Sequence, residues 1–309
     1  MKILFNYLIF PGFLFSVVAG LMAGWVDRKV TARLQYRVGP PLLQNFWDII
    51  KLFGKETIVP AQARSTFLIS PYIGLICAAL VAALVGRAVI FPLESFMGDL
   101  IVVVYFLMIP AVALMLGAFS SRNPLASVGA SREMKLILSY ELPFILSIIV
   151  VIIKSGGAIQ LGQILAYQQL SGSNIFLASG IISPSGAMAF FVAIFCMQAK
   201  LGYAPFEISE AEQEIMGGVL IEYSGAPLAI FKLTKAVLLY TLPLFLIVLF
   251  LGRDLSWWLI TLKYISLLVV IILIKNTNPR VRIDQAMRFF WRIPTVLAII
   301  AVGLAILGL

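Results

Sequence analysis

Histidine is absent from this chain of 309 residues, and cysteine occurs only twice, at Cys77 and Cys196. Both cysteines lie inside apolar runs, with no second cysteine nearby to complete a ligand set for zinc, haem or an iron–sulfur cluster. We interpret both as small buried apolar residues, which is a common environment for a free thiol. The shortage of ligands argues against a metal or redox centre, so we expect no cofactor within this chain.

Charge is scarce as well. Only 12% of the residues are charged, whereas 61% are hydrophobic, and the mean hydropathy is +1.04. A water-soluble domain of this size would not carry such a composition without aggregating. The apolar N-terminal stretch lacks a small-residue cleavage site followed by a polar domain, so we interpret it as a helix and not as a secretory signal. Lipid is therefore the expected solvent for most of the chain.

Long apolar runs are abundant. A helix needs about 20 residues to cross a bilayer, and runs of this length indicate helices because barrel strands would be about half as long. The chain shows no internal repeat and no low-complexity linker. We predict an all-α polytopic membrane protein with about eight transmembrane helices in a single membrane domain, residues 1–309. The predicted spans are 5–26, 67–89, 100–120, 136–153, 185–202, 226–251, 257–274 and 294–309.

The basic residues divide the connections between the spans into two sets. The net charge is +9, and the connections after the first, third, fifth and seventh spans, with the adjoining helix ends, hold 18 of the 23 Lys and Arg residues. By the positive-inside rule we expect this set in the cytoplasm of a plasma-membrane protein, with both termini outside. The charge thus indicates orientation and not a nucleic-acid partner. The outer connection 155–184 is uncharged, and we expect a short helix in it around 161–169.

The first connection, residues 27–64, is too polar to span a membrane and too apolar to be a loose loop. An apolar stripe recurs in it at helical spacing with charges offset from it, which predicts an amphipathic helix along the membrane surface. Gly39-Pro40-Pro41 fixes a bend before this helix. Two interpretations remain open, a cationic anchor on lipid and a docking surface for another subunit. The stripe comprises Leu43, Phe46, Trp47, Ile50 and Phe53, and the offset charges are Asp48, Lys51 and Lys55.

Carboxylates at a membrane edge are costly and are therefore functional candidates. Five carboxylates lie in one segment that contains no basic residue. Pro205-Phe206 forms a break before this segment, and the Gly217-Gly218 pair within it permits close backbone approach. If the segment is helical, Glu207, Glu210 and Glu214 share one face, where repulsion raises some pKa values. We interpret the segment as part of a proton path, with a solvated acidic helix end as the alternative. The five acids are Glu207, Glu210, Glu212, Glu214 and Glu222.

Glu141 stands in Ser139-Tyr140-Glu141-Leu142-Pro143, at the entry of the fourth predicted span. An acid at this depth is either paired or carries a proton. Lys232 and Lys235, inside the sixth predicted span, are the expected countercharges. Snorkelling to the cytoplasmic edge is the alternative for Lys232, whereas Lys235 lies deeper. All three residues therefore join the expected proton path.

Four motifs, in order along the chain, resemble those of the membrane H subunit (subunit 1) family of complex I. Ser139-Tyr140-Glu141 corresponds to the family's SYE. The family's first-loop signature is similar to Arg28-Lys29-Val30-Thr31-Ala32, Gln35, Arg37, Gly39-Pro40, Asp48 and Lys51-Leu52-Phe53-Gly54-Lys55-Glu56. Its third-loop signature is similar to Ala204-Pro205-Phe206-Glu207, Glu210-Ala211-Glu212-Gln213-Glu214 and Glu222-Tyr223-Ser224-Gly225. The resemblance covers essentially the whole chain, including the count of eight spans.

The resemblance implies a subunit without cofactors that lies under catalytic subunits and begins the charged path coupling redox chemistry to ion movement. It implies coupling roles for Glu141, Glu207, Glu210, Glu212, Glu214 and Glu222. It implies a docking surface made of Arg28, Lys29, Arg37, Asp48, Lys51, Lys55 and Glu56. The partners it implies are hydrogenase-like large and small catalytic subunits with iron–sulfur clusters and, in a hydrogenase, a NiFe centre. The resemblance also implies antiporter-like subunits, small membrane subunits and lipid as partners.

Two departures from quinone-reducing members bear on the substrate. Where those members usually read Glu-x-Asn-Arg, this chain has Lys200-Leu201-Gly202-Tyr203, and Lys235 stands where they have an acid. The changes resemble the membrane-bound NiFe hydrogenases and sulfane-reducing complexes of anaerobic thermophiles, which use no quinone. We therefore hypothesise a non-redox coupling subunit of a ferredoxin-driven membrane hydrogenase. The alternatives are the same subunit of a sulfane reductase or of a quinone-reducing complex I, a stand-alone ion transporter, and a purely structural anchor.

Overall fold

The computed structural model of the chain describes residues 2–61, 63, 65–170, 175, 177–178 and 181–308. At residues 2–4, 177–178, 181–182 and 212 it describes the backbone alone. Residues 64 and 309, which end two of the predicted ranges, lie outside the described chain.

Helices make up most of the described chain, and the strands described are one antiparallel pair of two residues each. In chain order the elements are α1 (Lys2–Leu8), α2 (Phe13–Leu34), α3 (Gln44–Phe53), α4 (Ser65–Ile90), η1 (Pro92–Glu94), α5 (Asp99–Ser120), α6 (Pro124–Lys154), α7 (Leu161–Leu170), β1 (Leu177–Ala178), β2 (Ile181–Ile182), α8 (Pro184–Lys200), α9 (Glu212–Ile215), η2 (Gly218–Leu220), α10 (Gly225–Phe250), α11 (Trp257–Thr277), α12 (Ile283–Arg292) and α13 (Pro294–Ile306).

The described residues contain seven helical stretches long and apolar enough to cross a membrane, with α1–α2 and α12–α13 counted as one stretch each. α8, with 17 residues, is a shorter apolar helix and corresponds to the fifth predicted span. The prediction of an all-α polytopic membrane protein is therefore confirmed. The amphipathic helix predicted in the first connection is α3, and the short helix predicted around 161–169 is α7.

Two predicted spans have wrong limits because the helices extend beyond their apolar runs into polar sequence. α2 continues to Leu34, so Arg28 and Lys29 lie on a helix and not in a loop. The last stretch begins at Ile283, since α12 leads directly into α13 at Pro294. An amphipathic helix such as α12 contributes too few apolar residues to be recognised as part of a span.

α6 also begins earlier than predicted. The Asn123 side chain accepts a hydrogen bond from the Leu125 N–H at 2.8 Å, and Pro124 occupies the first helical position. Both features favour a helix start because they satisfy or remove an unpaired backbone donor. Glu141 consequently lies in the middle of α6 and not near its start.

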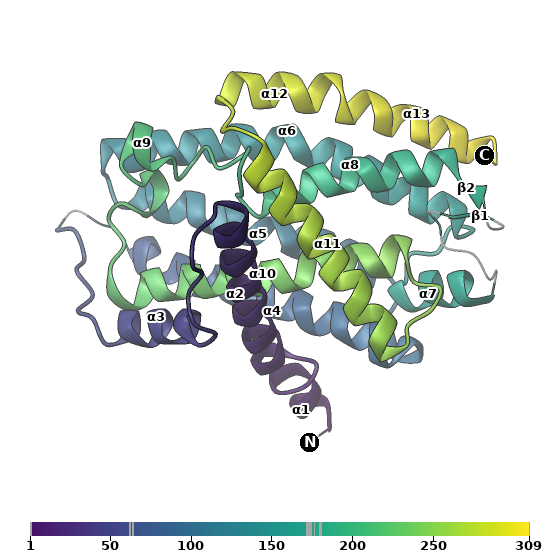
Figure 1. Ribbon diagram of the computed structural model, residues 1–309, viewed down its shortest axis with the longest axis horizontal. Helices are drawn as coiled ribbons and strands as arrows, with labels where there is room; N and C mark the ends of the chain where they lie inside the picture. Colours follow the sequence, from purple (N-terminus) through teal and green to yellow (C-terminus); the bar gives the residue numbers. More distant parts are fainter. Residues whose placement is uncertain are drawn as a thin grey trace.

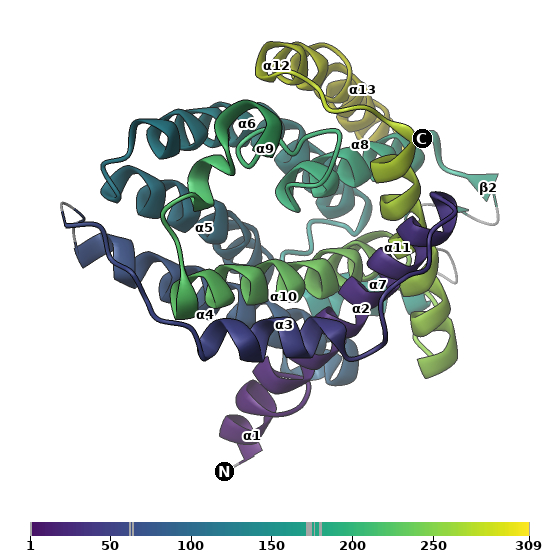
Figure 2. The same ribbon diagram turned by 60° about the vertical axis from the view of Figure 1, so that its left-hand side comes forward.

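α10 is the central helix of the fold. In its most apolar window 83% of the residues are buried, against 56% for α6, the next highest. It packs against α2, α3 and α4 and also contacts α6, α7, α8 and α11. Figure 1 shows α2 and α11 crossing it obliquely and α12–α13 running over α6 and α8, and Figure 2 shows α3 alongside it. Side chains on α10 therefore lie between elements that are distant in sequence.

The crossing of α2 over α10 depends on Gly20. A Cβ at this position would lie 2.2 Å from the carbonyl oxygen of Ala236 and 2.5 Å from its carbonyl carbon. Backbone atoms cannot turn aside as a flexible side chain can, so any larger residue would separate the helices. Small residues at such crossings are a general feature of helix packing in membranes.

We expect Gly20→Ala to destabilise the protein by about 1–3 kcal/mol, the usual cost of overpacking a close contact. Thermal unfolding in detergent measures the effect. Gly303→Ala on α13 is the matched control, because a Cβ there meets nothing within 4 Å. Equal shifts of the midpoint in the two variants would contradict the close crossing.

Candidate functional site

Glu141, on α6, forms an ion pair with Lys200, the last residue of α8. The Lys200 Nζ lies 2.7 Å from the Glu141 carboxylate, and the two side chains are 3% and 16% exposed, respectively. The ammonium group also lies 5.0 Å and 4.6 Å from the ring centroids of Tyr140 and Phe144, within the range of cation–π attraction. The pair is therefore buried among helices and stabilised by two aromatic faces.

The predicted countercharges of Glu141 are wrong. Lys235 pairs instead with Glu210, at 2.5 Å, and Lys232 is exposed, as the snorkelling alternative requires. α8 packs against α6, and this packing brings its terminal Lys200 to Glu141. Sequence alone does not reveal that contact, because the two residues are far apart in the chain.

The segment that carries the five acids, residues 205–222 and hereafter the acid segment, is not one helix. Only the short α9 and η2 are helical within it, so the prediction that Glu207, Glu210 and Glu214 share a helical face is wrong. Pro205 cannot donate to a helix continuing from α8. Gly217-Gly218 adopts positive φ angles of 92° and 49°, which reverse the chain and confirm the close approach predicted there.

Each acid whose side chain is described faces its own partner instead of another acid. Only Glu210 reaches the interior of the helix bundle, through its contact with Lys235. The side chain of Glu212 lies outside the described part of the structure. The remaining pairs are Glu207 with Arg280 at 2.9 Å, Glu214 with Arg132 at 2.5 Å, and Glu222 with the side-chain amide of Asn123. These outer contacts fasten the acid segment to α6 and to the chain before α12.

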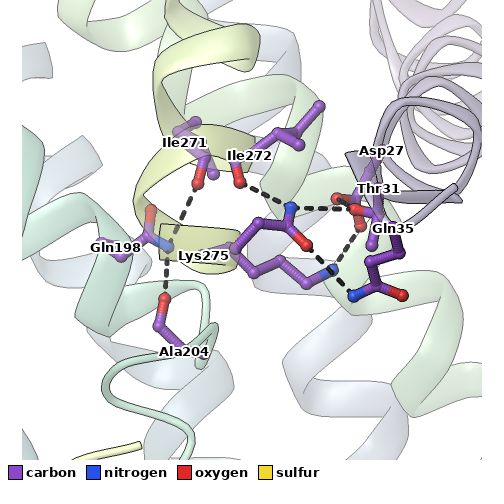
Figure 3. A network of polar contacts seen from close by, with 9 residues as sticks. Asp27, Thr31, Gln35, Gln198, Ala204, Ile271, Ile272 and Lys275 are labelled. Atoms are coloured by element: carbon purple, nitrogen blue, oxygen red, sulfur yellow. Dashed lines mark hydrogen bonds and ion pairs between the residues drawn. The ribbon is translucent and has the colours of Figure 1, made fainter. Parts of the chain in front are cut away.

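A third interior ion pair, partly buried and missed by the sequence reasoning, joins α2 to α11. The Lys275 Nζ lies 2.7 Å from the buried Asp27 carboxylate and 4.5 Å from the ring centroid of Tyr203. Figure 3 shows the pair in a polar network between the two helices, in which the Asn276 amide donates to the Thr31 hydroxyl at 3.1 Å. The available signal in the sequence was that Asp27 and Lys275, which carry opposite charges, directly follow two of the predicted spans.

Gln198, buried on α8, holds the loop that contains Tyr203. Its Nε2 donates to the carbonyl oxygens of Ala204, at 2.7 Å, and Ile271, at 3.4 Å (Figure 3). The loop is thereby tied to α11 beside the Asp27–Lys275 pair. Burial raises the pKa of Tyr203, so the phenol is uncharged at neutral pH.

Two cavities link the three ion pairs. The smaller, of about 50 Å³, has room for water and is lined by both Lys200 and Lys235. The larger, of about 230 Å³, lies between α2, α3 and α10 and is lined by Asp27. Lys235 lines both cavities. We call the three ion pairs and the two cavities the charge path; it runs from Asp27 past Lys235 and Glu210 to Lys200 and Glu141.

One more acid belongs to the charge path and was missed from sequence. Glu133, on α6, is 7% exposed and lines the smaller cavity beside Ser209. It precedes the apolar run of the fourth predicted span and follows Arg132, so the sequence there resembles a solvated helix start. The longer α6 found in the structure carries it into the interior.

The predicted docking residues differ in their surroundings. Arg28, on α2, and Asp48, on α3, form an ion pair at 2.8 Å that joins the two helices. Partial burial raises the pKa of Asp48, but hydrogen bonds from Arg28 and Gln44 outweigh it and leave that pKa lowered. The pair therefore stabilises the α2–α3 contact at neutral pH and is lost as Asp48 is protonated in acid. Lys29 is half-buried, and the exposed members are Arg28, Arg37, Lys51, Lys55 and Glu56.

α3 turns most of its apolar stripe away from the protein. Trp47 and Ile50 are 61% and 58% exposed, whereas Asn45 is buried and donates to the Leu21 carbonyl at 2.9 Å. An outward apolar stripe beside exposed lysines is suited to lipid and equally to a partner subunit. Both interpretations of the first connection therefore stay open.

The third-loop motif Tyr223-Ser224-Gly225 positions the first connection. The tyrosine ring stacks on Phe67 with centroids 4.2 Å apart, and burial raises its pKa to about 12 although a hydrogen bond with Ser70 opposes the shift. The serine hydroxyl accepts from the Ile58 N–H at 2.9 Å. The glycine has φ +58°, and a Cβ there would meet backbone carbonyls of the first connection. The motif thus anchors the loop that carries the docking residues.

Cys77 and Cys196 are free and buried, as predicted. Within the described chain no group of three or more Cys, Asp or Glu side chains is placed to hold a metal ion. The chemistry available at the charge path is the transfer and storage of protons by carboxylates and lysines.

We expect Lys200→Met to destabilise the protein by about 3–5 kcal/mol, because it leaves the Glu141 carboxylate buried without a cation. Replacing both partners, with Glu141→Leu added, should recover most of the loss since no buried charge remains. Unfolding in detergent, followed by circular dichroism, measures both variants. If the double variant is no more stable than the single one, the two groups are not a buried ion pair.

Sequence and structure comparisons agree over the whole length of the chain. The family model described as NADH dehydrogenase matches residues 6–306. The H subunit of NADH-quinone oxidoreductase from Thermomicrobium roseum is 35% identical over 330 residues, covering 98% of this chain and 95% of the relative. The corresponding protein of Bacillus thuringiensis is 29% identical, covering 93% and 90%.

Among solved structures, a chain of the membrane-bound sulfane sulfur reductase, an archaeal respiratory membrane complex, matches with a TM-score of 0.87. The identity is 28%, and the match covers 99% of this chain and 100% of that chain. The resemblance inferred from the motifs is therefore confirmed. The chain belongs to the NADH dehydrogenase family of membrane subunits that includes the H subunit of NADH-quinone oxidoreductase.

Proposed function

We propose that this chain is the non-redox membrane subunit of a complex I-like, ferredoxin-driven membrane-bound hydrogenase. In that complex it docks the catalytic arm and couples electron transfer to proton or ion translocation. The observation that carries the proposal is the charge path, three partly buried ion pairs linked by two cavities. Family membership supports its coarser part, a subunit of a multi-subunit membrane oxidoreductase.

Buried ion pairs suit such a path because each charge depends on its neighbour. A buried acid beside a cation stays ionised, whereas the same acid without the cation takes up a proton. Displacing Lys235 toward the larger cavity would leave Glu210 to be protonated and would alter the field at Lys200 and Glu141. A change at the α2–α3 face can thus reach the middle of α6 without an electron passing through this chain.

Electron transfer belongs to partner subunits in this proposal. Large and small catalytic subunits with iron–sulfur clusters and a NiFe centre would sit on the first connection, whose exposed cations include Arg37, Lys51 and Lys55. This arrangement requires the first connection to face the cytoplasm and both termini to lie outside. Antiporter-like and small membrane subunits would continue the ion movement within the bilayer.

A sulfane reductase is the second candidate, favoured by the match to the archaeal sulfane sulfur reductase chain. A quinone-reducing complex I is the third, favoured by the relatives named as the H subunit of NADH-quinone oxidoreductase. Lys200 and Lys235 weigh against quinone reduction, since both depart from the quinone-reducing pattern and both are engaged in ion pairs.

Purification of the intact complex by a tag on this chain distinguishes these candidates. We expect the complex to evolve hydrogen from reduced ferredoxin and to contain nickel. Sulfide formation from polysulfide without nickel would assign the chain to a sulfane reductase, and quinone reduction would assign it to complex I.

We expect Glu141→Gln in the assembled complex to abolish most ion movement per electron while electron transfer and assembly persist. Ion uptake by reconstituted vesicles, measured with electron flux, provides the readout. Unchanged coupling would support a purely structural anchor. Ion flux through the chain reconstituted by itself would instead support a stand-alone transporter.

A further inference from the structure

Glu133 is a buried carboxylate without a cation of its own. Within the described chain it makes no ion pair with any Lys or Arg, and it lines the smaller cavity beside Ser209. The other buried acid without an ion pair, Asp99, accepts the backbone N–H of Leu161 at 2.8 Å. Glu133 alone combines burial, the lack of an ion pair and a place in the wall of the smaller cavity, among the residues that the structure describes.

Close packing of α6 against the acid segment brings Glu133 to this position. Gly129 lies one turn earlier on the same face of α6, where a Cβ would stand 2.8 Å from the backbone nitrogen of Val219 and 3.0 Å from the carbonyl oxygen of Ser209. Glycine permits this approach and thereby sets Glu133 against the acid segment. Two turns further along the same face lies Tyr140, whose ring packs against the Lys200 ammonium group.

The charged groups around Glu133 are already matched with one another. Lys235 pairs with Glu210 at 2.5 Å, Lys200 pairs with Glu141 at 2.7 Å, and the remaining cation of the cavity wall, Lys232, is exposed. An ionised Glu133 would therefore be a buried charge without compensation, which is a costly state. The protonated form of Glu133 avoids this cost while both pairs are intact.

We propose that Glu133 is the proton-holding site of the charge path, and that Lys235 controls it by exchanging its partner between Glu210 and Glu133. This inference rests on the proposed coupling function. When Lys235 turns from Glu210 to Glu133, the Glu133 carboxyl gives its proton to water in the smaller cavity. Glu210, left without its cation, takes up one proton from the side of the larger cavity. One proton is released and one is bound, so the net charge of the cluster does not change.

Infrared difference spectroscopy on the assembled complex tests the holding site directly. The resting complex should show a C=O band of a protonated buried carboxyl that Glu133→Gln removes. Glu210→Gln should also remove it, although Glu133 is then present, because Lys235 is free to pair with Glu133 and ionise it. Asp284→Asn, at an exposed acid on α12, is the control that should leave the band unchanged.

Ion movement per electron provides the second readout, and we expect Glu133→Gln to lose most of it while electron transfer continues. If Glu141→Gln uncouples the complex but Glu133→Gln changes neither the band nor the coupling, this inference is wrong and the proposed function stands. If the band survives Glu210→Gln, the proposed change of partner by Lys235 from Glu210 to Glu133 does not occur. If neither Glu141→Gln nor Glu133→Gln alters ion movement, the proposed function fails and this inference fails with it.

Discussion

A charge buried among membrane helices needs an opposite charge beside it, and this constraint organises the interior of the protein. Three partly buried ion pairs join α2 to α11, α8 to α6, and the acid segment to α10. Each pair connects residues that are distant in the chain, so the pairs help to define how the helices pack. The most buried helix, α10, carries Lys235, which joins an interior ion pair and lines both cavities of the charge path.

The same constraint explains two departures from the quinone-reducing pattern. A lysine introduced into a membrane interior is tolerated when a carboxylate stands opposite, and Lys200 and Lys235 each have one. By the resemblance, each of these lysines stands at a position where quinone-reducing relatives usually carry an acid. The interior thus retains paired charges while the identity of the charged residues changes, which is compatible with a coupling role and a different electron acceptor.

Much of the fold could be predicted from sequence because apolar length alone identifies most of the spans. The limits of α2, α6 and α12–α13 could not, since caps such as Asn123 and ion pairs such as Asp27–Lys275 extend helices into polar sequence. At the site, sequence singled out Glu141, Glu210 and Lys235 as candidate residues. It assigned the wrong partners, because pairing depends on how α8 and the acid segment fold back on α6 and α10.

Glu133 shows a different limit of prediction. Nothing in its local sequence separates it from a solvated acid, and its burial follows from Gly129 allowing the acid segment to approach α6. Likewise, the tyrosine, serine and glycine at 223–225 match a family motif, yet their contacts are structural and hold the first connection in place. A matching motif therefore did not by itself distinguish coupling residues from those that position the docking loop.

The central claim is that coupling passes through Lys235, and ion movement per electron in a Lys235→Gln complex tests it most directly. The glutamine keeps much of the side chain's length but removes the positive charge that pairs with Glu210. We predict that electron transfer continues while ion movement per electron falls to a small fraction of the original value. Full ion movement per electron in that variant would contradict the account.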